Sequence, residues 1–372
     1  MGRICRKPDR LPSLGGRSSV ARWRHAAALL FVAVAASGGG TQPPAANPQA
    51  SASARALLAL LRALPSRPTG RLIAGQHCGG VRRLNERYEA TVEGVAQATG
   101  QRIALVGSDF IGGFDDAARA RLASHWRAGG LVTLCYHAPN PWTGGPSDDR
   151  TIGDFLELTT PGTPTYAAWQ RTLDQTAEWL AGLRDDGVVV LWRPFHEMNL
   201  PGSHWWASRD QAAFIALWRQ MFTRFSQEER LDNLLWVYSP NAEFVAPTKA
   251  TRPVEYYYPG PEYVDIVGLD TYTRGPLNLR EAGYQELLAL GKPMALCEFG
   301  PRGPVGEREP PDHTYAYGDL LRQLRDDYPE VVYFMAWMDS FALARQDGAA
   351  DLLGDDWVLT VGTLGSLLGP RS

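Results

Sequence analysis

Eight short apolar segments recur along the chain, and this recurrence limits the possible folds more than any other feature of the sequence. Each segment is apolar without strict alternation, which is typical of strands buried on both faces of a parallel sheet. Longer stretches with apolar residues at three- and four-residue spacings separate the segments and predict helices. The apolar segments are 71–77, 102–110, 130–137, 188–197, 233–241, 264–272, 292–300 and 331–340.

The helical patterns complete a repeating strand–helix order. They cover 54–64, 166–187, 210–230 and 314–328, and glycines at 129–130 and 187 stand where helices should stop. Eight strand–helix units in roughly 300 residues predict an α/β protein with a (β/α)8 TIM barrel fold. A doubly wound sheet is the main alternative, but no glycine-rich dinucleotide-binding motif follows an early strand. The sequence indicates no second folded domain.

The N-terminal segment has the pattern of a targeting signal. Arginines are frequent over the first 25 residues, and the apolar run Ala26–Ala36 precedes a serine and three glycines. This order predicts a secretory signal peptide over 1–37, and the run is too short to span a bilayer as a helix. A disordered tail rich in arginine and alanine is the alternative. Residues 38–53 predict a flexible leader, so 54–372 is expected to form the single catalytic domain of a secreted protein, extracellular or periplasmic.

Composition narrows the possible partners. The net charge is −3 and the arginines form no stripe, so we expect no nucleic-acid partner and, once the signal is removed, no membrane partner. Beyond the signal, the cysteines are Cys78, Cys135 and Cys297, an odd number with two inside apolar segments. We therefore predict buried thiols rather than a disulfide framework, and we expect a monomer. The 12 tryptophans and 14 tyrosines suit a core, and also a site that binds rings.

Polar and aromatic side chains gather at one end of the apolar segments. In a (β/α)8 barrel the active site lies at the carboxyl ends of the strands. Chance would seldom place His, Asp or Glu at most of these ends, so we interpret them as a ligand site at the barrel mouth. The residues are His77, Asp109, His137, His196 with Glu197, Asn241, Asp270 with Tyr272, Glu298, and Trp337 with Asp339.

Two glutamates stand out among these residues. Glu197 ends the fourth segment and Glu298 ends the seventh, and in a ring of eight strands the two positions face each other across the mouth. Such a pair suits hydrolysis of a glycosidic bond, with one general acid and one nucleophile roughly 5 Å apart in a retaining enzyme. Each carboxylate also raises the proton affinity of the other. A single glutamate there would be read as a salt bridge, for which Arg193 is near, but the pairing favours catalysis.

The motifs around these glutamates resemble a known family. "WRPFHEMN" (192–199) together with "ALCEFG" (295–300) is similar to glycoside hydrolase family 26, whose known members are mostly endo-β-1,4-mannanases. The resemblance extends over 71–360. It implies a (β/α)8 barrel, a retaining double displacement, no metal or other cofactor, and a polysaccharide or oligosaccharide as partner. It also implies that Glu197 is the acid/base and Glu298 the nucleophile.

Other site residues follow from the same resemblance. "YHAPNPW" (136–142) matches a strand-3 segment of the family, so His137 and Trp142 are expected to line the glycone side. Tyr272 resembles the tyrosine that hydrogen-bonds the nucleophile. Trp337 resembles the platform under the sugar at the cleavage point, where C–H groups of the sugar face an aromatic ring.

The resemblance also implies which glutamate performs each step of the mechanism. Glu298 is expected to attack the anomeric carbon while Glu197 protonates the leaving oxygen, and Glu197 then deprotonates water for the second step. His196, Tyr272 and Arg193 are expected to hold the carboxylates and the substrate in register.

The loop after the acid/base departs from the family pattern. The family motif continues with a glycine and an aromatic-rich stretch soon after the asparagine, whereas this chain has Leu200-Pro201 inserted and Ser203-His204 ahead of Trp205-Trp206. Loop changes alter specificity while leaving the chemistry intact. One of the two tryptophans is expected to contribute to the cleft, and Trp206 is our candidate.

Two other hypotheses remain open at this point. A metal-dependent hydrolase has suitable ligand types in His77, Cys78, His137, His196 and Asp270, but their spacing matches no H-x-H or H-E-x-x-H motif. A catalytically silent carbohydrate-binding protein would need no pair of glutamates. Within the family, β-1,3-xylan and mixed-linkage glucan remain alternative substrates, and the sequence does not distinguish endo from exo action.

Overall fold

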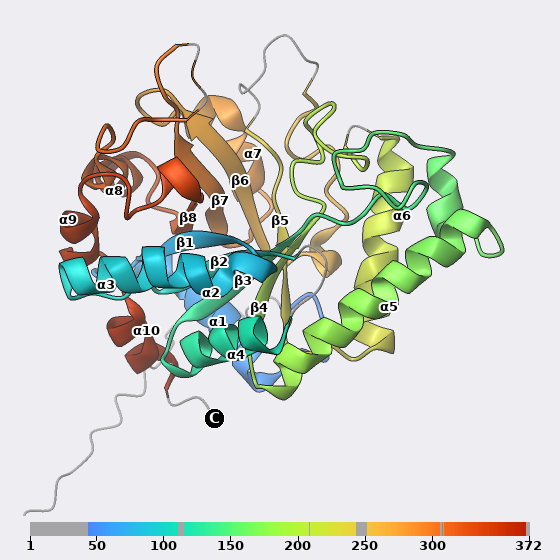
Figure 1. The fold of residues 1–372 in the computed structure, drawn as a ribbon, viewed down its shortest axis with the longest axis horizontal. Coiled ribbons are helices and arrows are strands. Elements are labelled where there is room, and N and C mark those ends of the chain that lie inside the picture. The colour runs from blue at the N-terminus through green and yellow to red at the C-terminus, as the bar shows by residue number, and fades with distance from the viewer. Residues whose placement is uncertain are drawn as a thin grey trace, which may run out of the picture. The chain divides into compact units, whose positions relative to one another are not determined.

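Eight parallel strands follow one another around a closed ring in the computed structural model (Figure 1), which describes residues 44–110, 115–207, 209–242, 251–305, 307 and 309–369. Each strand pairs with the next along the chain, and β1 also pairs with β8, which closes the ring. The strands are β1 (Leu72–Gly80), β2 (Leu105–Phe110), β3 (Leu131–Tyr136), β4 (Val190–Pro194), β5 (Leu234–Tyr238), β6 (Ile266–Thr273), β7 (Met294–Pro301) and β8 (Val331–Ala336). The predicted (β/α)8 TIM barrel is confirmed.

Helices surround this ring and bury its outer face. Every residue of β2, β3, β4, β5 and β8 is buried, as expected of strands covered on both sides. In Figure 1, α5 and α6 lie side by side, where Trp169 Nε1 donates to Gln220 Oε1 at 3.0 Å. Among the described residues the α-helices are α1 (Ala52–Ala63), α2 (Leu84–Tyr88), α3 (Gly94–Thr99), α4 (Asp116–Arg127), α5 (Pro164–Asp185), α6 (Gln211–Phe222), α7 (Tyr284–Leu288), α8 (Tyr317–Asp327), α9 (Ala349–Gly354) and α10 (Val361–Leu368).

Local sequence explains where the long helices begin and end. The Thr163 side chain accepts from the backbone N–H of Tyr166, and a proline occupies the first position of α5, where its missing N–H costs nothing. Gly129 and Gly187 follow α4 and α5 with φ of 101° and 76°, in the left-handed region that glycine enters without strain. The helix ends predicted at these glycines are confirmed.

Two features of the barrel are absent from the sequence prediction. A two-residue strand, β9 (Val358–Leu359), pairs with the start of β1, before β2 joins β1 at Gly75. It is too short for any periodicity to reveal it. In addition, π-helical turns at Glu89–Glu93 and Thr223–Glu228 continue α2 and α6, so the predicted helix over 210–230 changes its hydrogen-bonding pattern in its last turns.

The N-terminal predictions fall mostly outside the described residues. The predicted signal peptide (1–37) and the first part of the predicted leader lie outside them. Residues 44–53 are described, and they pack on the barrel: the backbone N–H of Ala46 donates to Asp265 Oδ1 at 2.7 Å, and Ala50 is buried. The folded chain therefore starts before the predicted boundary at 54, because these residues find backbone and apolar partners on the barrel. Within the described part of the chain, no helix combines the length and apolarity needed to cross a bilayer.

The three described cysteines are buried free thiols, as predicted from their apolar surroundings. Burial raises the pKa of Cys78 and of Cys297 to about 12. Thiols of this kind carry almost no thiolate at neutral pH, so they serve packing rather than nucleophilic chemistry.

Candidate active site at the carboxyl ends of the strands

Three carboxylates meet at the mouth of the barrel. Asp270 lies in β6 and Glu298 in β7, while Glu197 follows the end of β4. One oxygen of each of these three side chains lies within 4.8 Å of one oxygen of the other two. The structure therefore brings together the two glutamates that the sequence places on opposite walls of the ring.

Glu298 is clamped by two donors. Arg193 Nη2 donates to its Oε1 at 2.5 Å, and the Tyr272 hydroxyl donates to its Oε2 at 2.8 Å. The other arm of the guanidinium, Nη1, donates to Asp270 Oδ2 at 2.8 Å. The arginine and both carboxylates are buried, so the ion pairs are only weakly screened by water. This arrangement fixes the Glu298 carboxylate in one orientation.

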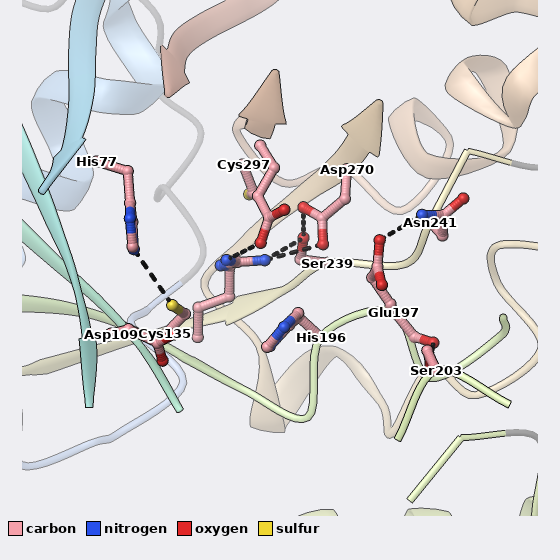
Figure 2. A network of polar contacts seen from close by, with 12 residues as sticks. His77, Asp109, Cys135, His196, Glu197, Ser203, Ser239, Asn241, Asp270 and Cys297 are labelled. Atoms are coloured by element: carbon pink, nitrogen blue, oxygen red, sulfur yellow. Dashed lines mark hydrogen bonds and ion pairs between the residues drawn. The ribbon is translucent and has the colours of Figure 1, made fainter. Parts of the chain in front are cut away.

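Further hydrogen bonds hold the partners of Glu298. The Ser239 hydroxyl donates to Asp270 Oδ1 at 2.5 Å, a bond that Figure 2 shows. Although burial alone would lower it, the charges of Asp270 and Glu298 raise the pKa of Arg193 well above its usual range. Burial, together with Glu298, raises the pKa of Tyr272 well above its usual range. The guanidinium therefore stays charged and the phenol stays a donor.

Glu197 has a different environment on the other side of the site. Asn241 Nδ2 donates to its Oε1 at 2.5 Å, and Figure 2 shows this bond at the end of the network opposite His77. Burial, and then the charge of Glu298, raise the pKa of Glu197 to about 7. A carboxyl group with this pKa holds its proton up to about neutral pH, which a general acid requires.

The backbone that carries Glu197 is strained. Phe195 and Glu197 have φ of 52° and 54°, a region that side chains other than glycine seldom enter and that costs about 1–3 kcal/mol per residue. The backbone N–H of Glu197 donates to the carbonyl of Ser239 at 2.9 Å, and its carbonyl accepts from Leu200 at 3.0 Å. These bonds hold the turn after β4, which carries the Glu197 side chain at the mouth.

Two predicted histidines lie beside the carboxylates. The His137 Nδ1 pairs with Asp109 Oδ1 at 2.6 Å. Burial alone would lower the pKa of His137, but the charge of Asp109 outweighs this effect and raises the pKa. The His137 ring packs edge-on against the ring of His196, with centroids 4.5 Å apart. Burial, and then the nearby Arg193, lower the pKa of His196 well below its usual range, so this ring is neutral.

The three predicted tryptophans occupy different surroundings. Trp337 is partly exposed and stacks on His77 with centroids 4.0 Å apart, so it lies on the β8–β1 side of the mouth. Trp142 is also partly exposed and packs edge-on against Trp205, with centroids 5.9 Å apart. Trp206 is fully buried, and its Nε1 donates to the carbonyl of His196 at 2.9 Å.

The buried position of Trp206 changes its expected role. The side chain exposes no ring face on which a sugar could stack, so its assignment to the cleft surface is not supported by the structure. It supports the backbone of His196 from behind instead. Trp205 is buried in the same way, with its Nε1 donating to the carbonyl of Ala138 at 2.9 Å. The altered loop is therefore followed by two tryptophans that pack in the core, not by an exposed aromatic side chain.

Several residues of the network were noted as strand ends but given no role in the glycosidase mechanism. Asn241, Asp270 and Asp109 each close one of the apolar segments, and the structure makes them partners of Glu197, Arg193 and His137. Their signal was their position at a strand end. Ser239 lies inside the predicted strand segment 233–241, and His204 was noted only as part of the altered loop, so neither was given a role.

The ligand set suggested for a metal-dependent hydrolase is not assembled. The thiol of Cys78 lies 3.7 Å from Thr91 Oγ1, and His77 bonds the backbone N–H of Gly79 and the thiol of Cys135. Within the described ranges, neither His77 nor Cys78 belongs to a group of three potential ligands. Asp270 is engaged by the guanidinium.

Comparisons with known proteins agree with this geometry. The model of glycosyl hydrolase family 26 matches residues 46–363. A mannan endo-1,4-beta-mannosidase from Bacillus subtilis is 31% identical over 339 residues, which cover 86% of this chain and 89% of that protein. Mannan endo-1,4-beta-mannosidase A and B from Caldalkalibacillus mannanilyticus is 32% identical over 339 residues, but there the chain spans only 62% of the relative's length. A solved structure of a Bacillus subtilis mannanase superposes with a TM-score of 0.76 at 28% identity, covering 87% of this chain and 96% of that one.

Proposed function

Since this chain belongs to glycosyl hydrolase family 26 and is therefore a glycoside hydrolase, we propose that it is a retaining endo-β-1,4-mannanase that cleaves mannan, galactomannan and glucomannan. The β-mannanase assignment is supported by relatives named for this activity, which match the chain over most of its length.

The observation that carries the retaining mechanism is the separation of the two glutamates. Retaining glycosidases hold their two carboxyl groups about 5–5.5 Å apart, whereas inverting enzymes need about 6.5–9.5 Å to fit a water molecule between carboxylate and sugar. Oxygens of Glu197 and Glu298 lie within 4.8 Å of each other. This spacing favours direct attack by one carboxylate over attack by an activated water.

The first step forms a covalent intermediate. An oxygen of Glu298 attacks the anomeric carbon, the bond from that carbon to the leaving oxygen breaks, and Glu197 gives its proton to this oxygen. Arg193 and Tyr272 hold the nucleophile in place. Because Glu197 has a pKa of about 7, its proton is available up to about neutral pH.

The second step restores the enzyme. Glu197, now a carboxylate, removes a proton from water, the water oxygen bonds to the anomeric carbon, and the ester bond to Glu298 breaks. The product keeps the configuration of the substrate, because the carbon has been attacked twice from opposite faces. His137, Trp142, His196 and Trp337 are proposed to contact the sugar on the glycone side.

A panel of polysaccharides tests the substrate. We expect the purified enzyme to release short oligosaccharides from mannan, galactomannan and glucomannan, and far fewer reducing ends from β-1,3-xylan or mixed-linkage glucan. Product sizes separate endo from exo action. Preference for either of the last two polymers would contradict the mannanase assignment, and sugar binding without reducing ends from any polymer would favour a silent carbohydrate-binding protein.

The pH dependence tests the role of Glu197. The carboxyl group is protonated below its pKa of about 7 and loses its proton above it, so kcat/KM for mannan should fall as pH rises through about 7. The hydrogen bond from Asn241 favours the ionised form of Glu197. Replacing Asn241 by alanine should therefore move this basic limb to higher pH. If the basic limb of the kcat/KM profile stays in place or moves to lower pH in the Asn241→Ala variant, Glu197 is not the acid.

We further propose that the protein is exported and acts as a monomer. The proposal is supported by the basic and apolar pattern of residues 1–37 and by a polymeric substrate that is found outside cells. N-terminal sequencing of protein from the culture medium should find a start near residue 38, and an intact Met1 there would contradict removal of a signal.

A further inference from the structure

Three histidines form a cluster at the barrel mouth beside the catalytic carboxylates. His137 follows β3, His196 follows β4, and His204 lies in the loop that departs from the family pattern. The ring centroids of His137 and His196 are 4.5 Å apart, and those of His204 lie 5.0 Å and 5.1 Å from the other two. One ring nitrogen of each histidine lies within 4.8 Å of one ring nitrogen of the other two.

The cluster contains buried nitrogens without protein partners. The Nδ1 atoms of His196 and His204 are buried and have no hydrogen-bond partner within the described structure. The two residues are only 2% and 9% exposed. Buried polar atoms normally have partners, so an unpaired pair in one place calls for a ligand. These two atoms are separate evidence from the spacing of the rings.

His137 is oriented as a metal-binding histidine usually is. Its Nδ1 pairs with Asp109 Oδ1 at 2.6 Å, which leaves Nε2 as its remaining ring nitrogen. In metalloproteins a ligating histidine commonly donates its other nitrogen to a carboxylate, which fixes the ring and raises its basicity. Asp109 is itself buried, so this orientation is firmly held.

We propose that His137, His196 and His204 bind one divalent transition ion of the Zn²⁺ class, and that the bound ion blocks the glycone side of the cleft. Imidazole nitrogens suit Zn²⁺, Ni²⁺ and Cu²⁺, and three histidines with an open fourth position are a known Zn²⁺ arrangement. The inhibition rests on the proposed function, because it needs His137 and His196 beside the sugar. The binding itself does not.

The rings must close slightly around the ion. With Zn–N distances of about 2.0–2.1 Å, a tetrahedral site holds its nitrogens about 3.3 Å apart, so separations of up to 4.8 Å must shrink by about 1.5 Å at most. His204 can supply this movement, because its loop contains Gly202 at φ 74°, whereas His137 is held by Asp109. The ion is a ligand that competes with substrate, and the two glutamates need no metal for their own chemistry.

Equilibrium dialysis of the whole protein with ZnCl₂ tests the binding. We expect one tightly bound equivalent of Zn²⁺ in the wild-type protein, and an affinity at least about tenfold lower in His204→Phe, which loses a ligand but keeps an aromatic ring stacked on Trp206. His204→Gln serves as a second variant if the phenylalanine disturbs folding. His313→Asn is the matched control, since it removes an exposed histidine paired with Asp347 and should bind Zn²⁺ like the wild type.

Mannan hydrolysis in the presence of ZnCl₂ gives the second readout. At mannan concentrations well below KM, the half-inhibitory concentration of Zn²⁺ should match its dissociation constant in the wild-type protein and rise at least about tenfold in His204→Phe, and chelation should restore full activity. Equal binding in His204→Phe and wild type would assign the ion to the catalytic carboxylates or to Cys135, and would overturn the proposal. Absence of any tight equivalent would overturn it too, while mannan hydrolysis without Zn²⁺ would still stand as evidence for the proposed function.

Discussion

Replacing Glu298 by alanine is expected to lower kcat for mannan by about 10⁴-fold or more, because no other group can then form the covalent bond to the anomeric carbon. Arg193 keeps Asp270 as a partner in the variant, so no buried guanidinium is left unpaired. Circular dichroism and thermal unfolding should therefore show a folded protein. Initial rates of reducing-end release from mannan provide the measurement.

A matched control and a rescue experiment sharpen this result. Glu309→Ala removes an exposed glutamate whose carboxylate accepts a hydrogen bond from the Ser340 hydroxyl at 2.9 Å, and it should leave kcat close to the wild-type value. Azide can enter the space left by the Glu298 side chain and should restore turnover on an activated aryl mannoside, with a glycosyl azide of inverted configuration as product. Near-normal activity of Glu298→Ala without azide would reject Glu298 as the nucleophile.

Replacing Glu197 by alanine is expected to give a loss that depends on the leaving group. On mannan, whose leaving oxygen must be protonated, kcat should fall by about 10²–10⁴-fold. A dinitrophenyl mannoside has a leaving group that departs without a proton, so its first step should be nearly normal. The second step still lacks a general base, and the glycosyl-enzyme should accumulate. Stopped-flow release of dinitrophenol should show a burst followed by a slow steady state.

The same variant offers an internal control. If Glu197 causes the basic limb near pH 7, this limb should be absent from the burst phase of the variant on the aryl substrate, because no proton is needed there. Equal losses on mannan and on the aryl mannoside, without a burst, would mean that Glu197 acts in binding or folding rather than in proton transfer.

Much of the fold could be predicted because parallel strands buried on both faces leave a strong signal. All eight apolar segments correspond to strands of the ring, since every one of these strands must be apolar over its length. Their carboxyl ends then share one rim, which is why polar residues separated by a hundred positions in the sequence, such as Glu197 and Glu298, could be placed together. β9 left no such signal, because two residues cannot show a period.

The partners of the carboxylates could not be predicted with the same certainty. Arg193 could have paired with either glutamate, and only the register of β4, β6 and β7 decides that it bridges Glu298 and Asp270. Asn241 reaches Glu197 because the chain after β5 passes beside the turn that holds Glu197, as the backbone bond to Ser239 shows. Side-chain pairing across strands depends on three-dimensional register, which residue patterns do not encode directly.

The loop after Glu197 shows a different limit. Its departure from the family pattern is visible in the sequence, but its direction is not. The structure turns Trp205 and Trp206 into the core and places His204 against His137 and His196. Large aromatic side chains gain most when fully buried, which favours the buried positions of Trp205 and Trp206. Trp206 as a cleft residue was the prediction that this burial does not support.

Covalent labelling provides the most direct test of the two-glutamate mechanism. A 2-deoxy-2-fluoro-β-mannosyl fluoride carries a good leaving group, and its ring fluorine slows hydrolysis of the intermediate, so the glycosyl-enzyme should persist long enough for peptide mass spectrometry. We predict one fluoromannosyl group per protein, attached to the peptide that contains Glu298 and to that side chain. A label on any other residue, or an unlabelled enzyme that releases product of inverted configuration, would contradict the mechanism.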